Sequence, residues 1–470
     1  MADEIDFGTE SYRHDSLPVS AQRLVNAYVE AQPHGAKSRK ILRGCPGIAD
    51  FATLGHGPIR AGLVMNTTAY FVSGDNLYSV DSSGVGTLLG AGIPGEDVVS
   101  MDGTGAEVVI TQGDTAYSYV LATNDFSQIT DSDFNPASTV TVINNIFAFD
   151  EVDSNRFQIS DILDGRTYLG DFASAESNPD YVIAVKNRNG VLVVFGQTTT
   201  EFWDHTGASD FPFTRYKGGT IDRGLRGPYA FTAEDESLFL LSNDLVFYQL
   251  VGQQKRRIST HALEQTWQKY GTTADAYCFS VPIEGHKFIY LVFPSENATF
   301  GFDIATQRWH ERVSYDSGGN EVKWRASCCV SAYDKVLVGD ANSGKIGILD
   351  PNVYTEFGDP IITSVTMPPI YQGGKLITIP TLEIDMETGV GLLSGQGSDP
   401  EVMLNISKDG GRTFPGPELI RALGGRGEHL TRLRWDRLGS ARQWVFKVSV
   451  SDPVKRVITG ARCPDIEIEV

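Results

Sequence analysis

The sequence has no long hydrophobic run. No stretch approaches the roughly 20 consecutive apolar residues that a membrane-spanning helix needs, so we expect no membrane insertion. The first residues, MADEIDFG, are acidic, whereas the same region of a secretory signal peptide is basic. We therefore expect the protein to be synthesised in the cytoplasm.

Cysteine is scarce, and its spacing does not suit metal binding. The five cysteines are Cys45, Cys278, Cys328, Cys329 and Cys463. No two of them form a C-x-x-C pair, and neighbouring residues of a strand point to opposite faces. The sequence thus predicts buried free thiols, with neither a disulfide framework nor a zinc site.

The common catalytic and cofactor-binding motifs are also missing. The sequence contains no GxxxxGK[ST], GxSxG or HExxH pattern, and none of its eight histidines are spaced at i, i+4. The acidic segments DSDFNPAS and DEVDSN lack the spacing of an EF-hand loop. We therefore assign no catalytic, cofactor-binding or metal-binding residue, and we expect no cofactor.

Positive charge is in deficit, and the deficit is confined to one part of the chain. Lysine and arginine number 39 against 59 aspartates and glutamates, a net charge of −20. From Pro360 to the end, acidic and basic residues balance, so the excess acid lies in the first 359 residues. This argues against a tight nucleic-acid grip there, because such binding needs clustered lysine and arginine.

What the sequence does contain is a repeated unit of strand, polar turn and strand. Aromatic and β-branched residues flank each turn, as in TAYFVSGDNLYSV, and the units recur at intervals of roughly 40–50 residues. The seven units cover residues 68–80, 107–120, 146–159, 191–204, 238–250, 288–303 and 335–349.

This period is typical of β-propeller blades. A single hairpin cannot bury its apolar face, whereas blades packed around an axis can, and closing the ring leaves only short edges exposed. The alternative is a stack of β-sandwiches, whose strands usually recur every 8–12 residues without a longer period. We predict an all-β chain with a propeller of six or seven blades over residues 58–359.

The segments that interrupt the repeat suggest contacts with other molecules. Residues 1–57 lack the hairpin pattern and are expected to form an N-terminal arm, either extended or with a short helix from Ser20. STHALEQTWQKYG has a helix pattern that ends at a glycine and places Trp267 on its apolar face. Trp267 and the loop arginines Arg223 and Arg226 are candidate interface residues; the alternative for the arginines is plain solvation.

Residues 360–470 change pattern and are predicted to form a β-sandwich-like domain. This domain contains SKDGGRTF, which fits the Asp-box S-x-D-x-G-x-T-[FW]. A carboxylate at this position accepts backbone N–H groups of the turn, the glycines permit positive φ, and the aromatic residue is expected to pack beneath. The residues of this structural turn are Ser407, Asp409, Gly411, Thr413 and Phe414.

The Asp-box raises an enzymatic alternative, because it occurs in sialidase propellers. There, too, it is a structural turn away from the chemistry, and here it occurs once, outside the propeller. A glycosidase needs a carboxylate pair or a tyrosine nucleophile placed by the fold, and the sequence singles out neither. A sialidase-like glycosidase and a glycan-binding propeller remain the alternatives to a structural protein.

Several segments in a fixed order resemble one protein family. QRLVNAYVEAQ and ILRGCPGIADF precede VVFGQTTTEFWDHTGA, LEIDMETGVG and the Asp-box segment, which is followed by RLRWDRLGSARQWVFKVSVSDP. In this order they resemble the tail-hub or nozzle proteins of short-tailed phages, also called packaged-DNA stabilisation proteins. The segments are distributed over nearly the whole chain.

The resemblance implies a non-enzymatic protein of the virion tail, made in the host cytoplasm. It implies a homo-hexameric ring below the portal and its adaptor, the head-to-tail connector, which extends the DNA channel. Such a ring helps to retain packaged DNA and anchors tail fibres, spikes or a needle. Double-stranded DNA would pass through without sequence-specific binding, and the acidic charge agrees with a conduit that does not hold its cargo.

Overall fold

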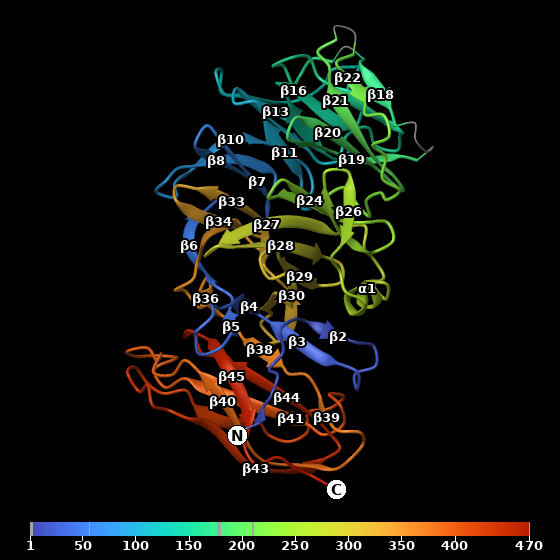
Figure 1. Ribbon diagram of the computed structural model, residues 1–470. Coiled ribbons are helices and arrows are strands. Elements are labelled where there is room, and N and C mark those ends of the chain that lie inside the picture. The colour runs from blue at the N-terminus through green and yellow to red at the C-terminus, as the bar shows by residue number, and fades with distance from the viewer. Residues whose placement is uncertain (1–2, 56, 169, 176–179, 209–210, 470) are drawn as a thin grey trace.

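A computed structural model describes residues 3–55, 57–168, 170–175, 180–208 and 211–469. Within them the regular secondary structure is almost entirely β-strand, arranged as a large propeller and a smaller β-sandwich joined by N-terminal strands (Figure 1). The predicted fold class is therefore confirmed. No helix in the described ranges is long and apolar enough to cross a bilayer.

In the described residues the propeller has seven blades of four antiparallel strands, which decides between the six and seven predicted; five blades are separate sheets and two are parts of larger sheets. The first blade consists of β7 (Ile59–Met65), β8 (Thr68–Ser73), β9 (Asn76–Val80) and β10 (Gly86–Ala91). The second consists of β11 (Ser100–Gly103), β12 (Glu107–Thr111), β13 (Ala116–Val120) and β14 (Asp125–Gln128). The third consists of β15 (Val140–Ile143), β16 (Ile146–Asp150), β17 (Arg156–Ile159) and β18 (Phe172–Ser174).

The fourth blade consists of β19 (Val182–Arg188), β20 (Val191–Gly196), β21 (Thr200–His205) and β22 (Phe213–Arg215). The fifth consists of β23 (Phe231–Glu234), β24 (Ser237–Leu241), β25 (Phe247–Val251) and β26 (Gln254–Arg257). The sixth consists of β27 (Tyr277–Ile283), β28 (His286–Phe293), β29 (Ala298–Asp303) and β30 (Arg308–Glu311). The middle two strands of each blade are the hairpins that repeat in the sequence.

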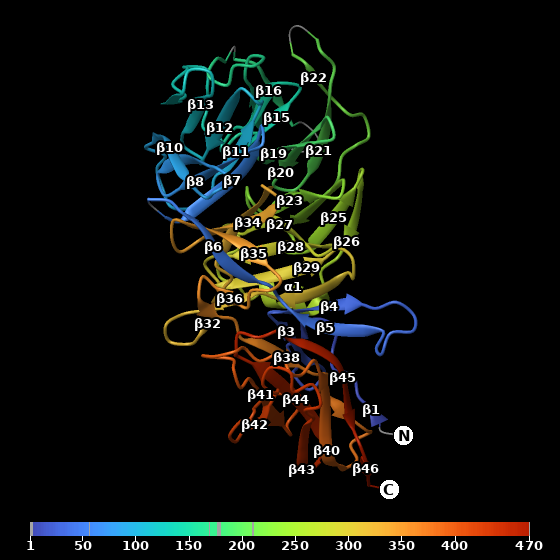
Figure 2. The same cartoon turned by 90° about the vertical axis from the view of Figure 1, so that its left-hand side faces the viewer.

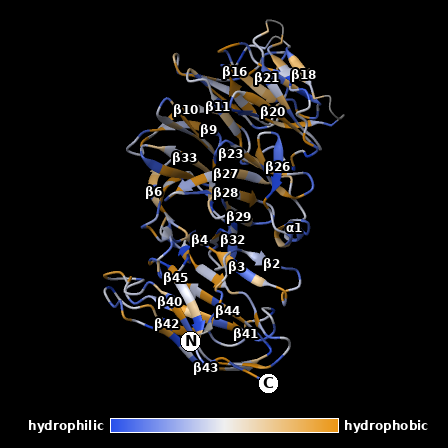
Figure 3. Cartoon of the chain, in the orientation of Figure 1, coloured by the Kyte–Doolittle hydropathy of each residue, from blue (hydrophilic) through white to orange (hydrophobic). Residues whose placement is uncertain are grey.

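A strand from the N-terminal segment completes the seventh blade. Three strands of this blade are consecutive in the chain: β33 (Ala326–Ala332), β34 (Lys335–Asp340) and β35 (Lys345–Asp350). The fourth is β6 (Gly47–Thr53), which pairs with β35 (Figure 2). The inner strand β33 lies against β7 of the first blade, so the ring is closed. Apolar residues of facing blades fill the space between them, and hydrophobic colour runs through the blade interiors in Figure 3.

The other N-terminal strands belong to the sandwich or to the junction. β1 (Asp3–Glu4), β4 (Ala27–Ala31) and β5 (Lys40–Gly44) join the sandwich sheet of β45 (Val457–Cys463), β40 (Ile377–Met386), β43 (Leu433–Ala441) and β46 (Glu467–Ile468). β2 (Tyr12–Arg13) and β3 (Ala21–Val25) join the facing sheet of β38 (Thr363–Thr366), β39 (Ile370–Tyr371), β44 (Gln443–Val450), β41 (Glu401–Ser407) and β42 (Leu419–Ala422).

The structure corrects the arm expected over residues 1–57. This segment is divided between the two domains and forms strands where a short helix from Ser20 was one alternative. Asn26, at a positive φ of 53°, breaks the strand between β3 and β4, which blurs the alternating pattern in the sequence. Leu24 and Val25 are 1% exposed, so the segment is part of the core and is not free to dock elsewhere.

Strand β3 makes one sheet continuous from the propeller to the sandwich. Val25 pairs with Glu311 of β30 in the sixth blade, and on the other side β3 pairs with β38. The resulting sheet has 11 strands. Because backbone hydrogen bonds cross the junction, the two domains form one unit (Figure 1).

A buried ion pair lies beside this junction. Arg312 donates to Glu356 at 3.0 Å and to the Asn26 side chain at 3.2 Å, and both charged side chains are almost fully buried. Glu356 also accepts hydrogen bonds from the Trp324 indole at 2.9 Å and the Ser314 hydroxyl at 2.6 Å. The short strands β31 (Val313–Tyr315), β32 (Glu321–Lys323), β36 (Thr355–Glu356) and β37 (Asp359–Pro360) surround it.

We predict that Glu356→Gln destabilises the protein by about 3–5 kcal/mol, because it leaves the Arg312 charge buried without a counter-ion. Glu321→Gln is the matched control, since Glu321 pairs with Arg23 at a more exposed position, and it should cost less than about 1 kcal/mol. Urea unfolding followed by tryptophan fluorescence measures both. Equal midpoints for the two variants would contradict a stabilising role for the buried pair.

Candidate functional site

The Asp-box forms a compact turn at the end of β41. The Ser407 hydroxyl donates to the Asp409 carboxylate at 2.6 Å and accepts the Gly411 N–H at 2.8 Å. Asp409 also accepts the N–H groups of Arg412 and Thr413 and the Thr413 hydroxyl at 2.7 Å. These hydrogen bonds, from Ser407 above all, hold the pKa of Asp409 below its usual range. The carboxylate is thus engaged within its own turn.

The Asp-box turn packs against the N-terminal segment. Gly411 has a φ of 86°, and a Cβ on it would lie 2.4 Å from the Cβ of Ala21. The amide of Gln443, on the neighbouring strand β44, donates to the carbonyl oxygen of Pro18 at 2.7 Å. Phe414 is partly exposed at the end of the turn. The turn therefore supports the segment that leads into β3.

The candidate interface residues lie in different environments. Arg226 is exposed and donates to the Thr273 hydroxyl at 2.7 Å, and Arg223 forms an ion pair with Asp244 at 2.8 Å. The structure contradicts the interface expected at Trp267. Its side chain is 0% exposed and packs against the rings of Phe293, Phe300 and Trp309.

Helix α1 (His261–Trp267) explains that correction. The Thr260 hydroxyl caps its first turn by accepting the Leu263 N–H at 3.4 Å. The apolar face with Leu263 and Trp267 points into the core between the fifth and sixth blades, and His261 on the other side is exposed. The helix prediction is correct, but the apolar face of the helix packs against the core of the same chain.

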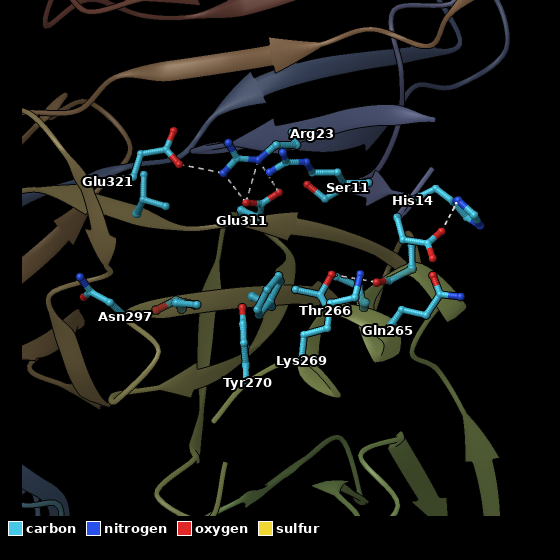
Figure 4. A pocket seen from close by; sticks show the side chains of 18 of the residues that line it. Ser11, His14, Arg23, Gln265, Thr266, Lys269, Tyr270, Asn297, Glu311 and Glu321 are labelled. Atoms are coloured by element: carbon cyan, nitrogen blue, oxygen red, sulfur yellow. Dashed lines mark hydrogen bonds and ion pairs between the residues drawn. The ribbon is translucent and has the colours of Figure 1, made fainter. Parts of the chain in front are cut away.

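A cleft of about 460 Å³ separates α1 from the N-terminal strands β2 and β3 (Figure 4). Arg23 donates to Glu311 at 3.0 Å and to Glu321 at 2.8 Å. Lys269 and Tyr270 line the opposite wall, which continues from α1 (Figure 4). The cleft is therefore polar and carries charges of both signs.

The Glu311 carboxylate of the cleft lacks the raised pKa of a glycosidase general acid. Burial alone would raise the pKa of Glu311, but the Arg23 guanidinium outweighs it, and the pKa lies below the usual value. A glycosidase acid needs a raised pKa to carry its proton at neutral pH. Among the described residues, no group of three or more histidine, cysteine, aspartate or glutamate side chains is placed to hold a metal ion.

The axis of the propeller is closed by a side chain. Two cavities lie along it, of about 660 and 320 Å³, and both are lined by Arg60, Tyr229 and Tyr277. The Tyr229 hydroxyl, ahead of the fifth blade, donates to the carbonyl oxygen of Ser138, ahead of the third, at 3.2 Å. Sequence reasoning missed these residues, because they converge from separate blades.

This architecture defines a structural class. A closed propeller and a sandwich share one sheet, and the conspicuous motif in the sequence, the Asp-box, supports the junction. The description "Bacteriophage P22 Gp10, beta-propeller" belongs to a family model that matches residues 8–354, and "Bacteriophage P22 Gp10, beta-sandwich" to one that matches residues 363–464. The chain belongs to this family of tail-hub, or packaged-DNA stabilisation, proteins of short-tailed phages.

The predicted family is thereby confirmed, and it is one of structural virion proteins. A search of curated proteins finds no match. Among solved structures, the designed protein Ika8 is 12% identical with a TM-score of 0.37, covering 64% of this chain and 99% of its own.

Two further solved structures resemble parts of the chain. The extracellular domain of the hybrid two-component system BT4673 from B. thetaiotaomicron is 8% identical with a TM-score of 0.44, covering 65% of this chain and 40% of its own. A chain of the mitotic checkpoint complex is 11% identical with a TM-score of 0.39, covering 68% of this chain and 96% of its own.

We predict that Asp409→Ala lowers stability by about 1–2 kcal/mol, because donors of the turn lose their acceptor. Gly411→Ala should be destabilising as well, through its positive φ and the contact with Ala21. The exposed Glu418→Ala is the control. Thermal unfolding at neutral pH measures all three, and an Asp409→Ala variant as stable as the control would refute the role of the turn.

The same variant has an expected pH dependence. The folded-state pKa of Asp409 is depressed, so its stabilisation is present above the unfolded value of about 3.9 and is lost as pH falls further. The difference between wild type and Asp409→Ala should therefore shrink below about pH 4.

Proposed function

We propose that six copies of this chain form a ring in the short tail, below the portal and its adaptor. The ring extends the DNA channel, helps to retain the packaged genome and anchors fibres, spikes or a needle on its outer surface. Family membership supports the coarse function, and the closed propeller axis is the observation that most favours a ring.

The closed axis bears on where DNA passes. The major groove of a duplex alone is about 12 Å wide. The Tyr229 side chain lies between the inner ends of the blades, where its hydroxyl donates to the Ser138 carbonyl oxygen at 3.2 Å, and it lines both central cavities. A single copy therefore cannot conduct DNA through its propeller, and a channel requires several copies around a shared axis. A closed ring of this kind uses head-to-tail contacts between unlike surfaces.

We infer that one of those contacts lies on the outer side of α1. This α1 surface consists of Arg226, His261, Gln268 and Lys269, which are all exposed and lie near the cleft of Figure 4 or the loop after the helix. The excess acid in the first 359 residues supplies a complementary charge on a neighbouring copy. The geometry also favours this contact, because a cleft next to a charged rim suits the concave side of a head-to-tail contact.

Arg226→Glu combined with Lys269→Glu should reduce ring formation on the adaptor, because both changes replace attraction by repulsion. Lys217→Glu with Lys375→Glu is the matched control, with the same charge change at exposed positions after the fourth blade and in the sandwich. Mass photometry of mixtures with the adaptor measures assembly. Normal rings from the α1 variant would exclude this surface, and the absence of rings from wild type would exclude the proposed assembly.

The charge distribution suggests how the channel treats its cargo. An acidic lining repels the duplex over about one Debye length, ~10 Å at 0.1 M salt, and lets it slide. We predict that replacing several channel-facing acids by lysine slows DNA release and makes its rate depend more steeply on salt, because new phosphate contacts form. The same number of lysines on the outer surface is the control. Unchanged release at low salt would contradict an acidic lining.

A further inference from the structure

The wider axial cavity, of about 660 Å³, lies where the inner strands of several blades begin. Its lining includes Arg60 at the start of the first blade, Asp97 ahead of the second, Tyr277 at the start of the sixth and Lys323 ahead of the seventh. The cavity has the size of small-molecule sites in proteins, which range over roughly 300–1,000 Å³.

Three polar groups on this cavity have no partner within the part of the chain that the structure describes. The Tyr277 hydroxyl is buried without a hydrogen bond, in a residue that is 5% exposed. One carboxylate oxygen of Asp275, Oδ1, is likewise buried and unpaired. The ammonium group of Lys323 has neither a hydrogen bond nor an ion pair there, and burial lowers its pKa. Buried polar groups are normally satisfied, so the unpaired atoms of Tyr277 and Asp275 point to a ligand, and Lys323 on the same cavity adds a donor.

The turn between β28 and β29 places two of these residues at the same mouth. The Ser295 backbone N–H donates to the Asp275 carboxylate at 2.8 Å. The side-chain oxygen of Asn297, two residues later, accepts the backbone N–H of Lys323 at 2.9 Å. Between them, Glu296 accepts the Gly271 N–H at 2.7 Å. The turn is therefore fixed on several sides, and the positions of Asp275 and Lys323 do not depend on a free loop.

The chemistry of the three groups selects a class of ligand. Lys323 can only donate, Asp275 can only accept, and the Tyr277 hydroxyl can do either. Adjacent hydroxyl groups meet all three demands, because each hydroxyl both donates and accepts. Phosphate is disfavoured, since the Arg60 guanidinium is already bonded to four carbonyl oxygens and Glu96 and Asp97 add negative charge to the lining.

We propose that the mouth of the propeller axis binds a neutral hexose, with ring hydroxyls that donate to Asp275 and accept from Lys323 and Tyr277. The sugar is either free or the terminal residue of a polysaccharide. The rings of Tyr229 and Tyr277 line the same cavity and offer apolar surface to the sugar C–H groups. This site goes beyond the proposed tail function, which does not require it.

Saturation-transfer NMR and calorimetry on the full chain test the proposal, with glucose, galactose, mannose and N-acetylglucosamine at millimolar concentration. At least one hexose should bind. The affinity for that hexose should fall about tenfold, the loss of roughly one hydrogen bond, in each of three variants: Tyr277→Phe, Asp275→Asn and Lys323→Met. Tyr181→Phe and Lys255→Met, at exposed positions, are the matched controls and should bind as wild type does.

Circular dichroism confirms that each variant is folded, and the conservative Tyr277→Phe removes a single oxygen. If a polysaccharide binds but no free sugar does, the site recognises the terminal residue of a polysaccharide. Failure of every sugar to bind wild type would overturn the proposal. Equal affinity of wild type and all three variants, or binding of inorganic phosphate or glycine in place of sugars, would overturn it as well.

Discussion

The structure depends on strand β3, which is hydrogen-bonded on one side to the sixth blade and on the other to the sandwich. On the blade side Val25 pairs with Glu311, and backbone N–H groups of Ser11 and Asn26 add hydrogen bonds to the same strand of the blade. The constraint explains several neighbouring features. Arg312 and Glu356 can be buried as a pair because the junction is fixed, and the Asp-box holds the chain just before β3. Strand β6, which follows β4 and β5 in the chain, then closes the propeller ring.

A protein built in this way suits a load-bearing place in a virion. Backbone hydrogen bonds from the blade to the sandwich make the chain one unit, so a force on either domain is transmitted to the other. In the ring that we propose, the propeller would form part of the wall, and the passage for DNA would lie between copies. The closed propeller axis leaves a small polar cavity at its mouth, which is suited to a ligand rather than to a polymer passing through.

The sequence predicts the hairpins well because the middle strands of the blades are buried on both faces, as the neighbouring residues Phe147 and Ala148 of β16 show. It does not predict how the ring closes, since β6 precedes its partner β35 by about 290 residues. Trp267 was misjudged because an apolar helix face looks the same whether it meets a core or a partner. Tyr277, Asp275 and Lys323 carry no local signal, and only the convergence of blades brings them together.

The most direct test of this account is an electron cryo-microscopy reconstruction of the assembled tail with DNA in transit. The account predicts a ring in which duplex density follows the shared axis and every propeller axis is closed at Tyr229. Duplex density within a propeller, or a chain attached to the tail as isolated single copies, would contradict it.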